Sequence, residues 1–257
     1  MRDLTVTSIL PMYYESSGTG VPIVFIHPPH MDHAVFRYQR QLAEHFRVIL
    51  YDIRGHGRSG IDAEPLTIPT LAADLLTLLD ELNIDRAVPC GYSSGGSVAQ
   101  EFALAYPERT KALILSGGFP KVNTFLLKNE FRAGMALVKA GKQRFLSKVL
   151  SFSHRITNED RHELFKHCIK ADELTAYRFY RESLHYDCTD RLHELSMPLL
   201  LLNGSRSVYM HPYIKYYLQR VKRVQSVFVS NITHQLPTKG YLPFNHAIKQ
   251  FVRSLEE

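Results

Sequence analysis

The stretch Gly91-Tyr92-Ser93-Ser94-Gly95-Gly96 decides how this chain is interpreted. It follows a short apolar run, 86–90, and it places glycine two positions before and two positions after a serine. This Gly-x-Ser-x-Gly arrangement is typical of a strained turn between a strand and a helix, where a Cβ at either glycine position would collide with the backbone. Backbone N–H groups and the dipole at the start of that helix favour developing negative charge. The stretch therefore predicts a strand, a sharp turn and a helix, with the Ser93 hydroxyl exposed at the turn.

The composition fits one large α/β domain. Of the 257 residues, 45% are hydrophobic and 22% are charged, which is enough apolar material for a substantial core. Met1–Leu10 carries charges of both signs and does not have the pattern of a secretory signal, and no stretch reaches the roughly 18–20 apolar residues of a membrane span. The three cysteines (Cys90, Cys168 and Cys188) are too widely spaced to predict a disulfide framework or a zinc site. We therefore expect a protein of the reducing cytoplasm.

The formal net charge of +6 raises the question of an anionic partner. The basic residues are scattered, and their densest group, at 215–223, alternates with Tyr216, Tyr217 and Leu218 as on the solvated face of an amphipathic helix. No nucleic-acid recognition motif accompanies the charge. We expect a small-molecule substrate and neither a nucleic-acid nor a membrane partner, and the sequence leaves the oligomeric state open.

Strand patterns and helix patterns alternate along the chain. Two apolar runs, 12–15 and 21–27, are separated by a turn of Ser, Gly and Thr, which predicts a hairpin. Further strands are predicted at 46–51, 86–90, 112–116, 198–202 and 226–229, and helices at 68–82 with Thr67 or Thr70 as cap, at 95–105 and at 247–255. This alternation predicts a parallel sheet with helices on both faces.

A helical insert interrupts this alternation of strands and helices. From Lys121 to about Tyr186 no strand pattern is convincing, while apolar residues recur at helical spacing. We expect a core formed by residues 1–119 and 191–257, with residues 120–190 as a separate helical unit.

Four motifs follow one another in a characteristic order. They are His27-Pro28-Pro29-His30 after an early strand, the Asp-x-Arg-Gly-His-Gly-x-Ser segment at 52–59, the serine turn at 91–96, and Thr233-His234 before the last helix. In this order the chain resembles the α/β-hydrolase family over essentially its whole length. The resemblance implies a mostly parallel, eight-stranded sheet with helices on both faces. It also implies that the helical insert is the family's lid.

The resemblance makes Ser93 the nucleophile of a nucleophile elbow and His234 its base. A serine hydroxyl alone is a poor nucleophile at neutral pH, so a base must accept its proton during the attack. His234 follows the strand 226–229, which suits a loop at the carboxyl edge of the sheet, where sites of this architecture gather.

The triad acid is where the sequence departs from the family pattern. The residue at the expected position is Ser207, and the alternative family position offers only Gly117 and Gly118. Removing the acid of a serine-protease triad costs on the order of 10⁴-fold in rate. We favour Ser207 as the group that accepts a hydrogen bond from the imidazole. A carboxylate from Asp187 or Asp190, at the end of the insert, is the alternative.

The sequence also departs from the family pattern at the residues expected to form the oxyanion hole. One donor is expected to be the backbone N–H of Ser94, the residue after the nucleophile. The second aligned position is Pro29, which has no N–H. Either a shifted loop lets His30 or Met31 donate, or the second donor is missing, which would cost about 10²–10³-fold in rate.

Other polar residues have structural interpretations. His27, His30, Asp32 and His33 lie close together in sequence, but the family loop explains them, and we expect neither a metal nor a cofactor. The segment 54–57 is interpreted as a structural turn. Cys90 lies in a central strand, so we expect it to be buried and inert.

The sequence thus favours a serine hydrolase, most simply a carboxylic ester hydrolase, acting on a small ester or related acyl compound. The many apolar and aromatic residues of the insert favour an apolar substrate group. Cleavage of an amide, a lactone or a carbon–carbon bond uses the same groups and stays open. The alternative from another class is a ligand-binding or regulatory protein that kept the fold and lost most of its catalysis.

Overall fold

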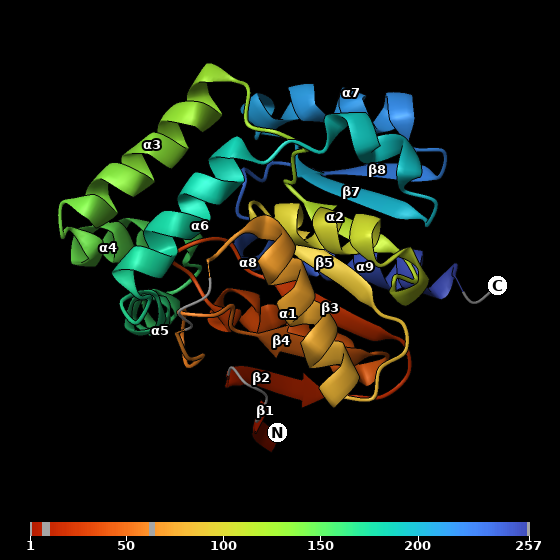
Figure 1. Ribbon diagram of the computed structural model, residues 1–257, viewed down its shortest axis with the longest axis horizontal. Coiled ribbons are helices and arrows are strands. Elements are labelled where there is room, and N and C mark those ends of the chain that lie inside the picture. Colours follow the sequence, from red (N-terminus) through yellow and green to blue (C-terminus); the bar gives the residue numbers. More distant parts are fainter. Residues whose placement is uncertain (1, 7–10, 62–64, 256–257) are drawn as a thin grey trace.

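The strands of the chain form one sheet whose pairs are mostly parallel (Figure 1). A computed structural model describes residues 2–6, 11–61 and 65–255, so part of the segment Met1–Leu10 discussed above lies outside the described residues. The sheet order is β1 (Arg2–Val6), β2 (Met12–Ser17), β4 (Arg47–Tyr51), β3 (Pro22–Ile26), β5 (Val88–Tyr92), β6 (Leu113–Ser116), β7 (Leu199–Gly204) and β8 (Val224–Val229). Strand β2 is antiparallel to β1 and to β4, and the pairs from β4 through β8 are parallel. The predicted parallel arrangement is confirmed.

Helices cover both faces of this sheet. They are η1 (His33–Glu44), α1 (Ile68–Glu81), α2 (Gly95–Ala105), η2 (Pro107–Arg109), α3 (Phe125–Lys139), α4 (Gln143–His154), α5 (Asn158–Cys168), α6 (Glu173–His185), η3 (Thr189–Glu194), η4 (Val208–Met210), α7 (His211–Arg220), α8 (Leu236–Lys239) and α9 (Tyr241–Arg253). Thr67 caps α1, since its hydroxyl accepts a hydrogen bond from the Thr70 N–H at 3.1 Å. Helix α9 begins before the predicted start at 247, because Pro243 falls in its first turn, where proline is tolerated.

Two apolar cores result from the alternation of side chains along the strands. On β3, Val24 and Ile26 belong to a core shared with α1 and α2, whereas Ile23 and Phe25 belong to a core shared with η1 and α9. A strand buried on both faces reads as a continuous apolar run, as these four residues do. The helices of the two faces thus fix the central strands from both sides.

The predicted hairpin between the first two apolar runs is wrong. Strand β4 lies between β2 and β3, so Ile49 pairs with Ser16 on one side and with Val24 on the other. The turn itself is present, with Gly18 at a φ of +75°. A Cβ at Gly18 would overlap the carbonyl oxygens of Ala43 and Phe46, so the segment leading into β4 packs directly onto this turn. Strand β4 therefore pairs with both β2 and β3, and β2 and β3 do not pair with each other as a hairpin.

The helical insert (residues 120–190) contains α3, α4, α5 and α6 and connects β6 to β7. These four helices gather at one end of the sheet (Figure 1). Helix α3 packs along α6, and α4 packs along α5. None of the helices in the described parts of the chain has the length and apolar character that crossing a bilayer requires. The three cysteines are buried free thiols, and burial raises the pKa of Cys90 well above its usual value.

The close contact of α2 with β3 leads to the first prediction. A Cβ at Gly95 would overlap the carbonyl of Ile26, whereas a Cβ at Gly96 would reach its nearest neighbours at 3.4 Å. We expect Gly95→Ala to lower the free energy of unfolding by about 3 kcal/mol and Gly96→Ala to change it by less than about 1 kcal/mol. Urea unfolding followed by circular dichroism measures both. Equal stability of the two variants would contradict the packing described.

Candidate active site

Ser93 stands at a strained turn between β5 and α2. Its φ is +52°, in the left-handed region that residues other than glycine rarely adopt. The Ser93 N–H donates to the carbonyl of Ser116 at 2.9 Å, which holds the turn against β6. A Cβ at Gly91 would lie 2.5 Å from the carbonyl oxygen of Gly95, so glycine is required there. The strand, turn and helix that the motif predicts are therefore present.

His234 lies in the loop between β8 and α8 and faces the serine turn. Its ring centroid is 5.2 Å from that of Tyr92 and 6.0 Å from that of Tyr209. A Cβ at Gly117 would lie 2.7 Å from its Nδ1, so the ring rests on the Gly117 backbone. His234 and Ser93 line the same small cavity, of about 60 Å³. The fold thus brings together two residues that are far apart in the sequence.

The imidazole of His234 is held in its neutral form. Burial lowers its pKa to about 3, and the nearby His154 adds to this effect. At neutral pH the ring can therefore accept a proton. Its Nδ1 atom is buried and has no hydrogen-bond partner among the described residues. In a serine-protease triad this nitrogen donates to the acid, which fixes the tautomer.

The orienting groups that the sequence suggested are not bound to His234. Ser207 is buried, and its hydroxyl has no hydrogen-bond partner in the described parts of the chain. Asp187 accepts instead from the Thr189 N–H at 2.9 Å and pairs with Lys121, and Asp190 is exposed in η3. The expected hydrogen bond is thus absent. A neutral hydroxyl attracts an imidazole far less than a carboxylate does, and here packing holds the ring.

The loop after β3 leaves one of the two suggested second donors, His30, as a candidate for the oxyanion hole. Pro29 lacks an N–H, and the N–H of Met31 donates to the carbonyl of Pro28 at 3.4 Å, so Met31 is not available as expected. His30 has a φ of +64°, and its Nε2 lies 3.0 Å from the Ser147 hydroxyl of α4. Within the described residues, no acceptor is bound by the backbone N–H of His30 or of Ser94. These two amides are the candidates that remain.

The cavity around Ser93 is closed by the helical insert. Its lining residues are Pro28, Pro29, Met31, Tyr92, Ser93, Ser94, Glu130, Phe131, Leu150, His154, Tyr180 and His234. Five of these come from the insert, and the sequence did not single out Glu130, Leu150 or His154. His154 bonds the helical insert to the serine turn, because its Nε2 lies 2.9 Å from the Tyr92 hydroxyl. Burial lowers the pKa of His154 to about 4, so it accepts this hydrogen bond as a neutral ring.

The segment 54–57, interpreted above as a structural turn, forms a turn in which the His56 N–H donates to the carbonyl of Ile53 at 2.9 Å. The Asp52 carboxylate accepts from the His33 ring at 2.6 Å and from the Arg58 N–H at 2.9 Å. The N–H of Ile53 donates to His27 at 2.9 Å. These bonds tie the 52–59 segment to the loop that follows β3. They fix that loop next to Ser93.

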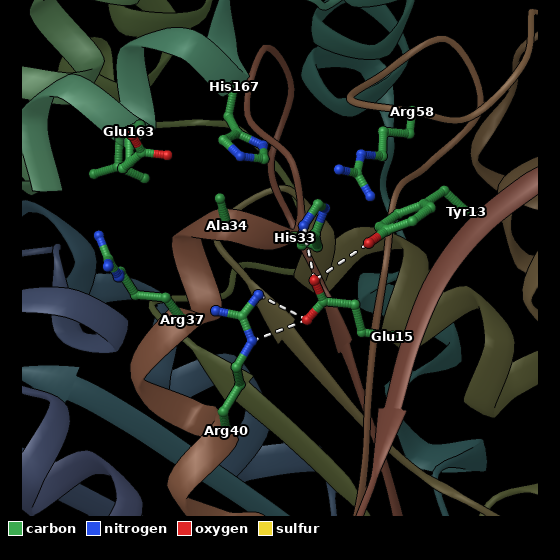
Figure 2. Close-up of a pocket in the computed structure, with 10 residues that line it drawn as sticks. Tyr13, Glu15, His33, Ala34, Arg37, Arg40, Arg58, Glu163 and His167 are labelled. Carbon is green, nitrogen blue, oxygen red and sulfur yellow. Dashed lines mark hydrogen bonds and ion pairs between the residues drawn. The ribbon is translucent and has the colours of Figure 1, made fainter. Parts of the chain in front are cut away.

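A second cavity, of about 220 Å³, is lined by residues of β2, η1 and α5 (Figure 2). It shares no lining residue with the cavity at Ser93. Burial opposes a charge on His33, but its hydrogen bonds to Asp52 and Glu15 outweigh burial and raise its pKa to about 10. Asp32, His33 and His167 have possible metal-binding atoms within 4.8 Å of one another. Each imidazole already donates its Nδ1–H to a carboxylate, and Arg37, Arg40 and Arg58 line the cavity. We interpret this cluster as an ion-pair network that joins core and insert.

Comparison with known proteins agrees with this geometry. Residues 21–190 match the family model of the alpha/beta hydrolase fold. The chain is 27% identical to the pimeloyl-[acyl-carrier protein] methyl ester esterase of Nitrosospira multiformis, over 87% of this chain and 91% of that protein. It is 37% identical to a protein of Azorhizobium caulinodans described as a carbamate hydrolase, over only 45% of this chain and 44% of that protein.

A solved structure shows the same arrangement. The thermophilic esterase of Thermogutta terrifontis, determined with malate bound, superimposes with a TM-score of 0.84 at 25% identity, over the whole of both chains. The family model covers most of the chain, and the order of the motifs, the sheet and the serine turn all agree with it. The chain belongs to the α/β-hydrolase fold family.

Proposed function

We propose that this protein is a serine hydrolase that cleaves a small, mainly apolar ester or related acyl compound. The observation that carries the proposal is that Ser93, at a left-handed turn, shares one cavity with the neutral imidazole of His234. Ser93 attacks the carbonyl carbon while His234 takes the hydroxyl proton. The alcohol then leaves with that proton, and water releases the acid from the acyl-serine in a second step.

The remaining groups of the cavity have supporting roles in this mechanism. The N–H groups of Ser94 and His30 stabilise the negative charge that develops on the carbonyl oxygen. The helical insert acts as a lid, since α3, α4 and α6 supply the wall of the cavity opposite the sheet. A wall that excludes water strengthens the electrostatic interactions inside it. The apolar lining, with Phe131 and Leu150, favours an apolar acyl or alcohol group.

The relatives support ester cleavage as the main reaction. The Nitrosospira relative and the Thermogutta structure are both named as esterases. The Azorhizobium relative, described as a carbamate hydrolase, keeps cleavage of a C–N bond open for this chain.

One observation favours the second candidate, a binding protein with weakened catalysis. Among the described residues, the Nδ1 atom of His234 has no hydrogen-bond partner, and the acid position is a serine. Such a protein would bind a small apolar ligand in the cavity without turnover. Retention of both Ser93 and His234 in one cavity favours the enzyme, because binding alone requires neither.

The nucleophile is tested by covalent labelling. We expect a fluorophosphonate to label the protein at Ser93, and the Ser93→Ala variant to lose both labelling and the hydrolysis of nitrophenyl acetate, because the proposed attack uses the Ser93 hydroxyl and its transfer of a proton to His234. Intact-mass spectrometry and a chromogenic assay measure the two effects. A folded wild-type protein that takes up no label, and binds a small apolar ligand without turnover, would favour the second candidate.

The acid position is tested by adding the missing carboxylate. We expect Ser207→Asp to raise kcat/KM for nitrophenyl acetate by at least about tenfold, because a carboxylate at this position stabilises the imidazolium formed in the transition state. Ser207→Asn is the matched control, since it has nearly the same shape without the charge. We expect Ser207→Ala to change kcat/KM by less than about twofold, because its hydroxyl is not bonded to the ring. A tenfold loss in Ser207→Ala would show that the serine orients His234.

The low pKa of His234 predicts an unusual pH dependence. In the folded protein the ring stays neutral down to a pH of about 3, whereas the unfolded chain protonates it near its ordinary pKa of 6.5. We therefore expect kcat/KM to stay level from pH 8 down to about 5, without the usual decline near 6.5. The contribution of this ring to stability is present above pH 6.5 and is lost as the pH falls toward 3. A pH–rate profile with a limb near 6.5 would contradict the burial described.

A further inference from the structure

Among the described residues that line the cavity around Ser93, Glu130 is the one charged group. It lies on α3 of the helical insert. The two histidines of the lining, His154 and His234, have pKa values of about 4 and about 3, so both are neutral at neutral pH. The other lining residues are neutral as well. The site in which the reaction is proposed to occur therefore carries a single negative charge.

No ion pair in the described parts of the chain neutralises the Glu130 carboxylate. Among the described residues, no arginine, lysine or histidine forms an ion pair with it, and no hydrogen bond to its side chain is formed. Other carboxylates near the insert are held, as Asp160 is by Arg37 and Asp32 is by His167. Glu130 is exposed at the mouth of the cavity, while the surrounding lid residues partly desolvate its carboxyl and raise its pKa. A bound cation would offset that desolvation.

Aromatic side chains line the same cavity as Glu130. Among them are Tyr92, Phe131 and Tyr180. Burial raises the pKa of Tyr92 and of Tyr180, and the negative charge of Glu130 adds to the shift of both. Aromatic faces attract alkylammonium groups, and a nearby carboxylate adds a direct charge attraction.

We propose that the substrate of this site carries an alkylammonium group, which binds between the Glu130 carboxylate and the aromatic rings while its ester carbonyl faces Ser93. This proposal rests on the proposed function. It also means that Glu130 determines specificity, because the same charge repels substrates with a carboxylate or a phosphate. A neutral ester can enter, but it lacks the charge attraction.

The experiment compares two esters that differ only in charge. Acetylcholine and 3,3-dimethylbutyl acetate have nearly the same shape, with a quaternary nitrogen in one and a quaternary carbon in the other. We expect the wild-type protein to have a higher kcat/KM for acetylcholine than for 3,3-dimethylbutyl acetate. We expect Glu130→Gln to lower the ratio of these two kcat/KM values by about tenfold, mainly by raising KM for acetylcholine, because the charge contact is partly exposed and acts on binding. Glu173→Gln is the matched control, because it removes one exposed charge of the insert away from the cavity.

Binding to the Ser93→Ala variant separates this proposal from the proposed function. Calorimetry on Ser93→Ala, and on Ser93→Ala combined with Glu130→Gln, measures the affinities for both esters without turnover. Tighter binding of acetylcholine that is lost with Glu130→Gln supports the cation site, even if the wild-type protein hydrolyses neither ester and the proposed function fails. If the wild type hydrolyses both esters but the ratio of kcat/KM is the same in wild type, Glu130→Gln and Glu173→Gln, the cation site is overturned and the hydrolase stands.

Discussion

The contact between the start of α2 and the carboxyl end of β3 is the constraint on which the rest of the site depends. Gly95 lies so close to the carbonyl of Ile26 that no side chain fits, and Gly91 lies as close to the carbonyl of Gly95. The chain can pass from β5 to α2 in so small a space only if Ser93 adopts a left-handed conformation. Two apolar cores pack on the two faces of β3 and β5, and this packing stabilises the strained conformation of Ser93. The hydroxyl is thereby presented at the carboxyl edge of the sheet.

The loops around Ser93 are fixed by a polar network rather than by apolar packing. Asp52 bonds both the His33 ring and the backbone of its own turn, and the imidazolium of His33 is in turn held by Glu15. His167 of α5 reaches the same network through Asp32. The network thus sets the position of the loop that carries His30 and anchors the insert to the core. A residue far from Ser93 can in this way affect the position of the His30 amide, the proposed oxyanion donor.

His234, the proposed base, is positioned in an unusual way for a group that would serve a serine nucleophile. Contacts with Tyr92, Tyr209 and the Gly117 backbone hold the His234 ring, and a carboxylate does not. Packing fixes the position of a ring, but it does not stabilise the positive charge that the ring acquires during the reaction. The same burial that keeps His234 neutral also makes its protonated form costly. We therefore expect slower chemistry than in a complete triad, with binding of the substrate supplying more of the selectivity.

The sequence by itself determined the alternation of strands and helices, the serine turn and the identity of its nucleophile and base candidates. Apolar periodicity and glycine spacing are local properties, so residues 91–96 and the Thr67 cap were predictable. The pairing of β4 between β2 and β3, and the unpaired Nδ1 of His234, depend on contacts between distant segments, and the sequence predictions for both were wrong. Glu130 and His154 had no local signal, because a charged or polar residue on an amphipathic helix is ordinarily solvated. Only the tertiary structure, by folding α3 and α4 over Ser93, decided that these two side chains line the site.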